Sequence, residues 1–297
     1  LGADVEADRQ ALGRVDARAG HVERELALGD AHAAAALIAE AEDALVVGGH
    51  DEADVLERGV GVTGFTFFSP ENLKRLISGI LEDCELTPDY ELGFEGHPNN
   101  TTTEHLRVLY DLGFRRCSFG VQDYDAEVQR VIHRIQPLEN VKRVTEEARR
   151  MGYTSISHDL VFGLPKQTLQ GVLENIRITG ELKPDRIVFY SYAHVPWIKG
   201  LGQRGYDEKD LPADEVKREL YEQGKMLLTQ MGYEEIGMDH FALPHDTLAE
   251  AQENHTLHRN FMGYTELRTQ VLLGLGVSAI SETPTCFHQN GCRCGNI

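Results

Sequence analysis

The sequence predicts an α/β fold in which a parallel sheet with helical crossovers closes into a partial (β/α) barrel. Apolar strand-like segments and amphipathic helix-like segments alternate regularly from Ser69 onward. The helical segments are long enough to connect parallel strands, and this alternation is typical of a parallel sheet. Polar residues also gather where the predicted strands end, which is where such folds bind their ligands.

The first predicted helix begins at Ser69, which is a good N-cap, and Pro70 suits the first helical position. The next helix ends on Gly113, because a left-handed C-cap favours glycine. In chain order, the predicted helices are 69–83, 101–113, 125–133, 137–152, 168–182 and 214–232, and the predicted strands are 90–96, 115–121, 154–163 and 185–194.

Three later segments show no helical or strand period beyond short pieces. They are 233–244, 257–265 and 272–281, all rich in His, Gly, aromatic and small residues. We interpret them as binding loops. The first contains Asp239 and His240, which form either a general-base pair, a metal site or a structural hydrogen bond, and the second contains His258 and Arg259.

We expect three parts along the chain. Residues 1–64 contain no Lys, Phe, Tyr or Trp and are rich in Ala, Asp, Glu and Arg. This composition predicts an atypical extension in which residues 21–46 form a helix and the hydrophobic core is thin. We expect residues 65–285 to form the barrel domain and residues 286–297 to form an irregular tail. The extension is either a helical linker or a stretch that is foreign to the domain after it.

The formal charge of −19 over 297 residues argues against nucleic acid or an anionic membrane as a partner, since both would be repelled. It favours a small-molecule ligand. The chain has neither an apolar run long enough to span a membrane nor a signal-peptide pattern, so we predict a cytoplasmic protein, and we expect a monomer. Five cysteines in a chain of this size favour free thiols or metal ligands over disulfides.

Four successive strands deliver polar side chains at their carboxyl ends, where an α/β sheet forms its ligand crevice. Any one of these side chains is also compatible with a cap or a loop hydrogen bond, but four strands in succession favour a ligand site. The residues are Glu95 and His97, Gln122 and Asp123, Asp159, and Tyr190, Tyr192 and His194.

Asp159 lies within an apolar run, where an ionised carboxylate is costly without partners. It either accepts hydrogen bonds from the hydroxyl groups of a ligand or pairs with an arginine. Arg134 is the arginine that we expect to approach it across the sheet face, and its guanidinium also suits a ligand carboxylate. The residues alone leave both alternatives open.

Six long and unusual strings follow one another between about residues 66 and 285. They are "GFRRCSFGVQDYDAEVQRVIHRIQ", "GYTSISHDLVFGLPKQT", "PDRIVFYSYAHVPWIKG", "GMDHFA", "LHRNFMGYT" and "LLGLGVSAIS". Together they resemble the oxygen-independent coproporphyrinogen III oxidases of the radical S-adenosylmethionine (SAM) superfamily.

The resemblance implies a partial (β/α) barrel of the radical SAM type, a 4Fe–4S cluster and two SAM molecules. It implies an enzyme of haem biosynthesis, a coproporphyrinogen dehydrogenase that converts coproporphyrinogen III to protoporphyrinogen IX by oxidative decarboxylation of two propionates to vinyls. In that chemistry the cluster, reduced by an electron donor, cleaves SAM to a 5′-deoxyadenosyl radical, which abstracts a propionate hydrogen.

The resemblance also implies which residues bind the cofactor. Glu95 would contact one SAM molecule, and Ile280 would line the adenine side of the same molecule. The implied contacts to the other SAM are Gln122, Arg134, Asp159 and Ala193. The resemblance identifies no catalytic residue. The porphyrinogen carries four carboxylates, for which the candidate cations are Arg115, Arg116, Lys199 and Arg259.

The cluster motif of the family, CxxxCxxC, is missing, and so is the "GGTPT"-like loop after it. Residues 1–64 contain no cysteine, and "VGVTGFT" at 60–66 stands where the loop is expected. We therefore predict no metal ligands in this chain. One hypothesis is that 1–64 is translated from a shifted reading frame; an upstream nucleotide sequence with no frame encoding both motifs would exclude it.

The last residues, "TCFHQNGCRCGNI", contain Cys286, Cys292, Cys294 and His288, a set that zinc could use. The spacing of these cysteines is not that of the CxxxCxxC motif, and the segment "GCRCGNI" does not resemble the sequences of the family. We therefore interpret the tail as the place where the resemblance stops, before the family's C-terminal domain. Two alternatives to the oxidase stay open: a related haem chaperone or haem-degrading enzyme, and a non-catalytic protein that binds SAM or porphyrin.

Overall fold

The structure, a computed structural model, describes residues 66, 68–82, 90–194, 206–260, 263–266 and 280–290. The chain divides into two compact units, one formed by Leu1–Val47 with Thr269–Ile297 and the other by Gly48–Arg268. The predicted helix over 21–46 lies outside the described residues. Among the helices that are described, none is both long and apolar enough to cross a membrane.

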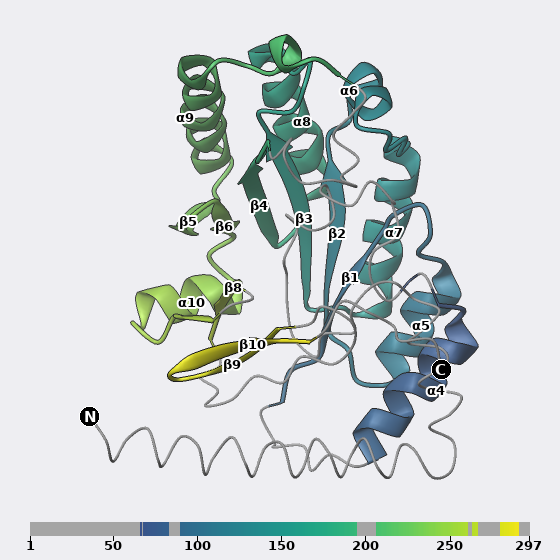
Figure 1. Cartoon of the computed structure of the whole chain (residues 1–297). Helices are drawn as coiled ribbons and strands as arrows, with labels where there is room; N and C mark the ends of the chain where they lie inside the picture. Colours follow the sequence, from purple (N-terminus) through teal and green to yellow (C-terminus); the bar gives the residue numbers. More distant parts are fainter. Residues whose placement is uncertain are drawn as a thin grey trace. The chain divides into compact units, whose positions relative to one another are not determined.

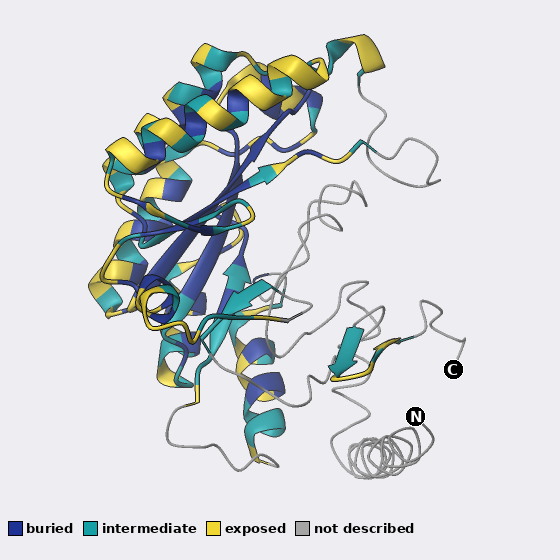
Figure 2. Ribbon diagram, turned by 90° about the vertical axis from the view of Figure 1, so that its left-hand side faces the viewer, coloured by how far each residue is buried: buried dark blue, intermediate teal, exposed yellow. Residues whose placement is uncertain are grey.

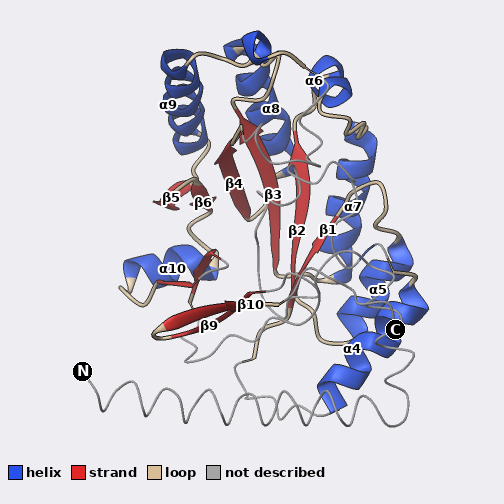
Figure 3. Cartoon of the chain, viewed as in Figure 1, coloured by secondary structure: helices blue, strands red, loops and turns tan. Residues whose placement is uncertain are grey.

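The larger unit alternates strands and helices along most of its described length (Figures 1 and 3). Its helices are α4 Pro70–Glu82, α5 Thr103–Asp111, α6 Ala126–Val131, α7 Leu138–Met151, α8 Leu169–Leu182, the 3₁₀ turn η2 Glu208–Asp210, α9 Asp214–Gln230 and α10 Thr247–Glu253. Its strands are β1 Gly93–Gly96, β2 Arg116–Gln122, β3 Ser155–Phe162, β4 Arg186–Ser191, β5 Glu234–Gly237, β6 His240–Ala242, β7 His258–Asn260 and β8 Gly263–Thr265.

Six of these strands form one sheet in the order β1-β2-β3-β4-β6-β5. Strands β1 to β4 are parallel, and helical segments connect them, whereas β6 runs antiparallel to β4 and β5 antiparallel to β6. The predicted α/β class and its parallel sheet with helical crossovers are thereby confirmed. Each predicted helix after residue 68 is also present.

Local sequence signals fix several helix ends. The Oγ1 atom of Thr102 accepts a hydrogen bond from the backbone N–H of His105, and the side chain of Thr168 caps α8 in the same way. Gly113 follows α5 with φ 102°, a conformation that glycine adopts without strain, as predicted. These contacts satisfy backbone groups that the helix itself leaves unpaired.

Two of the expected binding loops contain regular structure. Residues 233–244 form β5 and β6, residues 257–265 include β7 and β8, and α10 lies between the two pairs. The expectation of irregular loops was therefore wrong for these segments. Strands of three or four residues are too short to show a period of two, and here pairing with β4 extends the sheet.

The hydrophobic core lies between the sheet and α7, α8 and α9. Buried residues of β3 and β4 pack against Val141, Ile176 and Leu220 of these three helices. Figure 2 shows the strands buried and the outer surfaces of the helices exposed. Burying each large apolar side chain contributes about 1.5–3 kcal/mol. Gly224 lets α9 approach closely, because a Cβ at this position would lie 2.6 Å from the ring of Phe189.

The smaller unit contains one described hairpin. Strand β9, Ile280–Thr283, pairs antiparallel with β10, Cys286–Gln289. Part of the segment expected to be an irregular tail therefore forms a strand, and residues 291–297, with Cys292 and Cys294, lie outside the described residues.

Candidate functional site

One face of the sheet is polar. The register aligns Glu95, Ser118 and Ser157 in one row across β1, β2 and β3, and a second row runs through Gly120 and Asp159. Because alternate residues of a strand face opposite sides, these rows share a face. The residues between them belong to the other face: His158 of β3, for example, hydrogen-bonds Thr145 of α7 at 2.8 Å. The helices therefore cover the apolar face.

The carboxyl end of β2 has an unusual backbone. The ladder with β3 shifts register between Gly120 and Gln122, and Gln122 has φ 65°. Gly120 has no room for a side chain, because an added Cβ would lie 2.7 Å from Nη2 of Arg134 and 3.0 Å from Nε2 of Gln122. Nη2 of Arg134 donates to the carbonyl oxygen of Gly120 at 2.8 Å. This register shift is a β-bulge. It places the side chains of Gln122 and Arg134, two of the predicted cofactor contacts, next to Gly120.

Gln136 also contacts the backbone of this bulge, and the sequence analysis did not predict it. Its Nε2 atom donates to the carbonyl oxygens of Gly120 and Val121 at 3.0 and 3.1 Å, and the side chain is buried. The signal was its place in "HRIQP", two residues after Arg134. None of the described residues donates to the buried Oε1 atom of Gln122 or to that of Gln136. A buried acceptor without a donor costs free energy, so it marks a position where a ligand N–H or O–H fits.

Asp159 lies beside Gly120 on the neighbouring strand. Its Cα is the register partner of Gly120, and its carboxylate accepts hydrogen bonds from the hydroxyl groups of Ser118 and Ser157. The side chain is 1 % exposed. The two serines give the carboxylate neutral donors, which is one way that a protein stabilises a buried acidic group. Asp159 and Arg134 therefore approach the same glycine from the strand and from the loop, and their predicted roles as cofactor contacts stay predictions.

Glu95 and His97 lie at the end of β1. Nδ1 of His97 accepts a hydrogen bond from the backbone N–H of Asn99 at 3.1 Å. Burial, and to a smaller extent the positive charge of Arg134, lower the pKa of His97 to about 4, with the carboxylate of Glu95 opposing both effects. His97 is therefore neutral near pH 7. The interactions also show that Glu95 and Arg134 lie near the same ring.

Ala193 and Ile280 are the last two predicted cofactor contacts. Ala193 follows β4 by two residues and is exposed, at the same end of the sheet as Gln122. Ile280 begins β9 and belongs to the other compact unit. The larger unit thus holds Glu95, Gln122, Arg134, Asp159 and Ala193, and the role of Ile280 stays a prediction.

The Asp239–His240 pair does not form the hydrogen bond of a general-base pair. Nδ1 of His240 lies 2.8 Å from the carbonyl oxygen of Met238, to which it donates. Burial raises the pKa of Asp239, and the carboxylate of Glu235 adds to this effect. No group of three or more His, Cys, Asp or Glu residues among those described could hold a metal ion. The metal-site alternative for this pair therefore has no support.

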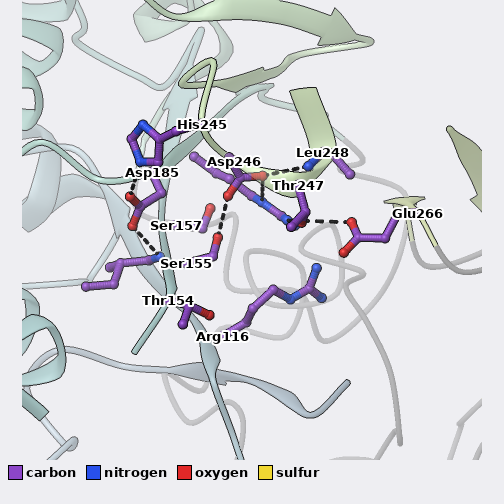
Figure 4. A network of polar contacts seen from close by, with 12 residues as sticks. Arg116, Thr154, Ser155, Ser157, Asp185, His245, Asp246, Thr247, Leu248 and Glu266 are labelled. Atoms are coloured by element: carbon purple, nitrogen blue, oxygen red, sulfur yellow. Dashed lines mark hydrogen bonds and ion pairs between the residues drawn. The ribbon is translucent and has the colours of Figure 1, made fainter. Parts of the chain in front are cut away.

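The amino end of the polar face is a network of ion pairs (Figure 4). Asp246 accepts from Nε of Arg186 and from the hydroxyl group of Ser155, both at 2.7 Å, and from the backbone N–H of Leu248 at 2.8 Å. It thereby ties β3 and β4 to the start of α10. A buried carboxylate with three donors is a structural contact rather than a ligand site.

Two of the arginines considered for substrate carboxylates are used within the protein. Nε of Arg116 lies 2.6 Å from Glu91, and Nη1 of Arg115 donates to two backbone carbonyl oxygens while its guanidinium lies over the ring of Tyr110. Lys199 lies outside the described residues. Arg259 is exposed on β7.

A 4Fe–4S cluster does not fit the cysteines of this chain. The five cysteines are Cys84, Cys117, Cys286, Cys292 and Cys294, and none of them forms the CxxxCxxC spacing. Cys117 is buried beside apolar residues on the helix-facing side of β2, where desolvation raises the pKa of its thiol well above the usual value. A buried neutral thiol is a poor cluster ligand, because ligation requires the thiolate.

Comparisons with known proteins give one consistent answer. Residues 50–178 match the Radical SAM superfamily. The chain is 42% identical over 226 residues to the oxygen-independent coproporphyrinogen III oxidase of Helicobacter pylori strain J99. The aligned region covers 76% of this chain and 49% of that protein. It is 41% identical over 225 residues to the Escherichia coli K12 oxidase, with the same two shares.

A solved structure agrees with these matches. The coproporphyrinogen III oxidase from Escherichia coli, described as a radical SAM enzyme, superposes with a TM-score of 0.73 at 40% identity, over 77% of this chain and 52% of that one. The fold is therefore that of the radical SAM enzymes. The chain spans about half the length of the curated relatives it matches.

Proposed function

The chain belongs to the radical SAM superfamily, and on this premise we propose that it binds SAM and a porphyrinogen in the oxygen-independent oxidation of coproporphyrinogen III to protoporphyrinogen IX. The proposed reaction removes CO₂ from two propionate side chains and leaves vinyl groups. One observation carries the proposal: Gln122, Arg134 and Asp159 meet around Gly120 towards the carboxyl end of the sheet, where the buried Oε1 atoms of Gln122 and Gln136 have no donor among the described residues.

The chemistry of these groups suits SAM. SAM carries a carboxylate, an ammonium group, ribose hydroxyls and an adenine. We propose that the guanidinium of Arg134 pairs with the carboxylate, that Gln122 accepts a hydrogen bond from the ammonium or a hydroxyl, and that Asp159 accepts another. We propose that Ala193 provides backbone contact for the adenine. We also propose that Glu95 contacts a second SAM molecule, and the assignment of Ile280 stays a prediction from the resemblance.

The cluster that radical SAM chemistry requires is not part of this assignment. Since no cysteines of this chain have the required spacing, we assign its residues the binding and positioning of SAM and porphyrinogen, and no step of radical formation. This lack of ligands favours a second candidate function: a protein that binds SAM and porphyrin without turnover.

The remaining partners are proposals too. The formal charge of −19 supports a small-molecule substrate over a nucleic acid, and exposed arginines such as Arg259 are needed to bind an anionic porphyrinogen against this field. We propose a cytoplasmic monomer that depends on a separate electron donor if it turns over.

Turnover and binding are tested in one anaerobic experiment. The whole chain is treated with iron and sulfide and incubated with SAM, dithionite and coproporphyrinogen III, and 5′-deoxyadenosine and protoporphyrin are measured after oxidation. Both products would establish the oxidase. Binding of SAM and coproporphyrinogen by equilibrium dialysis without either product would establish the non-catalytic function. Binding of neither molecule would contradict the proposal.

A further inference from the structure

The turn between β5 and β6 has a strained backbone. Met238 and Asp239 have φ 31° and 67°, and Gly237 before them has φ 143°. Two consecutive non-glycine residues with positive φ are uncommon, because this conformation is unfavourable for residues that carry a Cβ atom. The carbonyl oxygen of Asp239 accepts the backbone N–H of Phe189 at 2.8 Å, which holds the turn against β4. This geometry fixes the position of His240, the first residue of β6.

His240 lies on the same face of the sheet as the proposed SAM site. Its Cα is paired with Val188, and Val188 is paired with Asp159, so one row crosses β3, β4 and β6. Adjacent strands are about 4.8 Å apart, which puts the backbones of Asp159 and His240 roughly 10 Å from each other. The row therefore leads directly from the SAM site to the turn.

Aromatic rings gather at this end of the row. The ring of His240 lies edge to face with Tyr190 at 6.0 Å and with Tyr264 at 5.2 Å between centroids. All three side chains are partly exposed, whereas Asp159 in the same row is buried. We call Tyr190, His240 and Tyr264 the aromatic shelf. Partly exposed rings that hold one another in place can pack against a flat apolar ligand.

A cation lies beside the aromatic shelf. The guanidinium of Arg259 lies 5.8 Å from the ring centroid of Tyr264, and the side chain is exposed. Within the described ranges, no carboxylate forms an ion pair with it. Because Nδ1 of His240 donates to the carbonyl oxygen of Met238, Nε2 is the acceptor nitrogen of that ring. The shelf thus combines apolar rings, a hydrogen-bond acceptor and a positive charge.

We propose that the aromatic shelf binds one pyrrole ring of the tetrapyrrole substrate and that Arg259 binds a carboxylate of that substrate. A porphyrinogen is apolar at its rings, carries pyrrole N–H donors and bears carboxylates at its edge, so each part has a counterpart here. This assignment rests on the proposed function and adds its substrate-positioning residues.

Tetrapyrrole binding by the whole chain tests the assignment. The probes are coproporphyrin III and its tetramethyl ester, which lacks the carboxylates, and fluorescence reports binding. We expect Arg259→Gln to weaken coproporphyrin III roughly tenfold and to leave the ester unchanged, because one charged contact is lost. We expect Arg259→Lys to recover part of the loss, and Tyr264→Leu to weaken both probes. Thermal unfolding checks that each variant is folded.

The controls separate this assignment from the proposed function. Arg218→Gln removes another exposed arginine, on α9, and should change neither probe. SAM affinity should be unchanged in every variant. Wild-type binding with unchanged affinity in Arg259→Gln and Tyr264→Leu would overturn the shelf and leave the proposed function standing. If the wild type binds neither porphyrin, the proposed function fails and the shelf fails with it.

Discussion

Two buried side chains on the polar face, Asp246 and Gln122, differ in how their oxygens are hydrogen-bonded. At the amino end Asp246 is 4 % exposed, and its two oxygens accept from Arg186, Ser155 and Leu248. At the carboxyl end Gln122 is 2 % exposed, has φ 65°, and its oxygen finds no donor among the described residues. Asp246, whose oxygens have three donors, therefore holds the sheet together, whereas Gln122 combines an acceptor without a donor with a strained backbone, which is the combination that we interpret as a binding position.

Breaking the satisfied end should have the largest effect on stability. Asp246→Ala removes the shorter ion pair of the buried Arg186, which keeps only Glu266 at 3.9 Å and Thr247, and we expect the free energy of unfolding to fall by about 3 kcal/mol. Urea denaturation measures this. Arg218→Gln, which breaks an exposed ion pair with Glu222, is the matched control and should change stability by less than about 0.5 kcal/mol. A loss below about 1 kcal/mol in Asp246→Ala would show that the network is not structural.

Acid should destabilise the carboxyl end through His97. Its pKa is about 4 in the folded protein and 6.5 in the unfolded chain, so the folded state favours the neutral ring. The stabilising contribution is complete above pH 6.5 and is lost as the pH falls towards 4, at most about 3 kcal/mol. His97→Asn keeps an acceptor for Asn99 but does not titrate, and its stability should depend less on pH over this range.

The control for this prediction is His133→Asn. His133 is exposed and has φ 57°, a conformation that asparagine tolerates, so this variant should follow the wild-type pH profile. Unfolding by urea at pH 4.5 and 7 gives the comparison. Identical profiles for His97→Asn and the wild type would mean that His97 is not held neutral.

Gln122→Gly should separate stability from binding. Glycine relieves the positive φ and removes the unpaired acceptor, so we expect the free energy of unfolding to rise by about 1 kcal/mol. SAM affinity should fall roughly tenfold, since one ligand hydrogen bond is lost. Thermal unfolding and SAM titration measure the two effects. Reduced stability with unchanged affinity would reverse the roles that we give to the two ends.

The sequence predicted the long elements because their signals are local. Pro70, Gly113 and the helical spacing of apolar residues placed the helices, and the alternation with strands gave the α/β class. Polar residues at strand ends predicted the site because parallel strands bring their carboxyl ends together. Gln122, Arg134 and Asp159 accordingly lie around Gly120, and Glu95 lies in the adjacent row of the same face.

What the sequence did not predict depends on pairing between distant segments. Strands β5 and β6 form because β4 offers an edge, and the row from Asp159 to His240 exists only in that register. The network around Asp246 joins residues that are 60 and 91 positions apart. Periodicity cannot reveal such contacts. The sequence therefore suggested Asp239 and His240 as a pair, whereas in the structure only His240 belongs to the aromatic shelf.

Calorimetric titration of SAM into the whole chain and into Asp159→Asn tests the central claim most directly. Asparagine keeps the size of the side chain but removes the charge between Ser118 and Ser157. We predict that the wild type binds SAM and that Asp159→Asn binds it at least roughly tenfold more weakly while remaining folded. Equal SAM affinity in the two proteins, or no SAM binding by the wild type, would contradict a SAM site at the carboxyl end of the sheet.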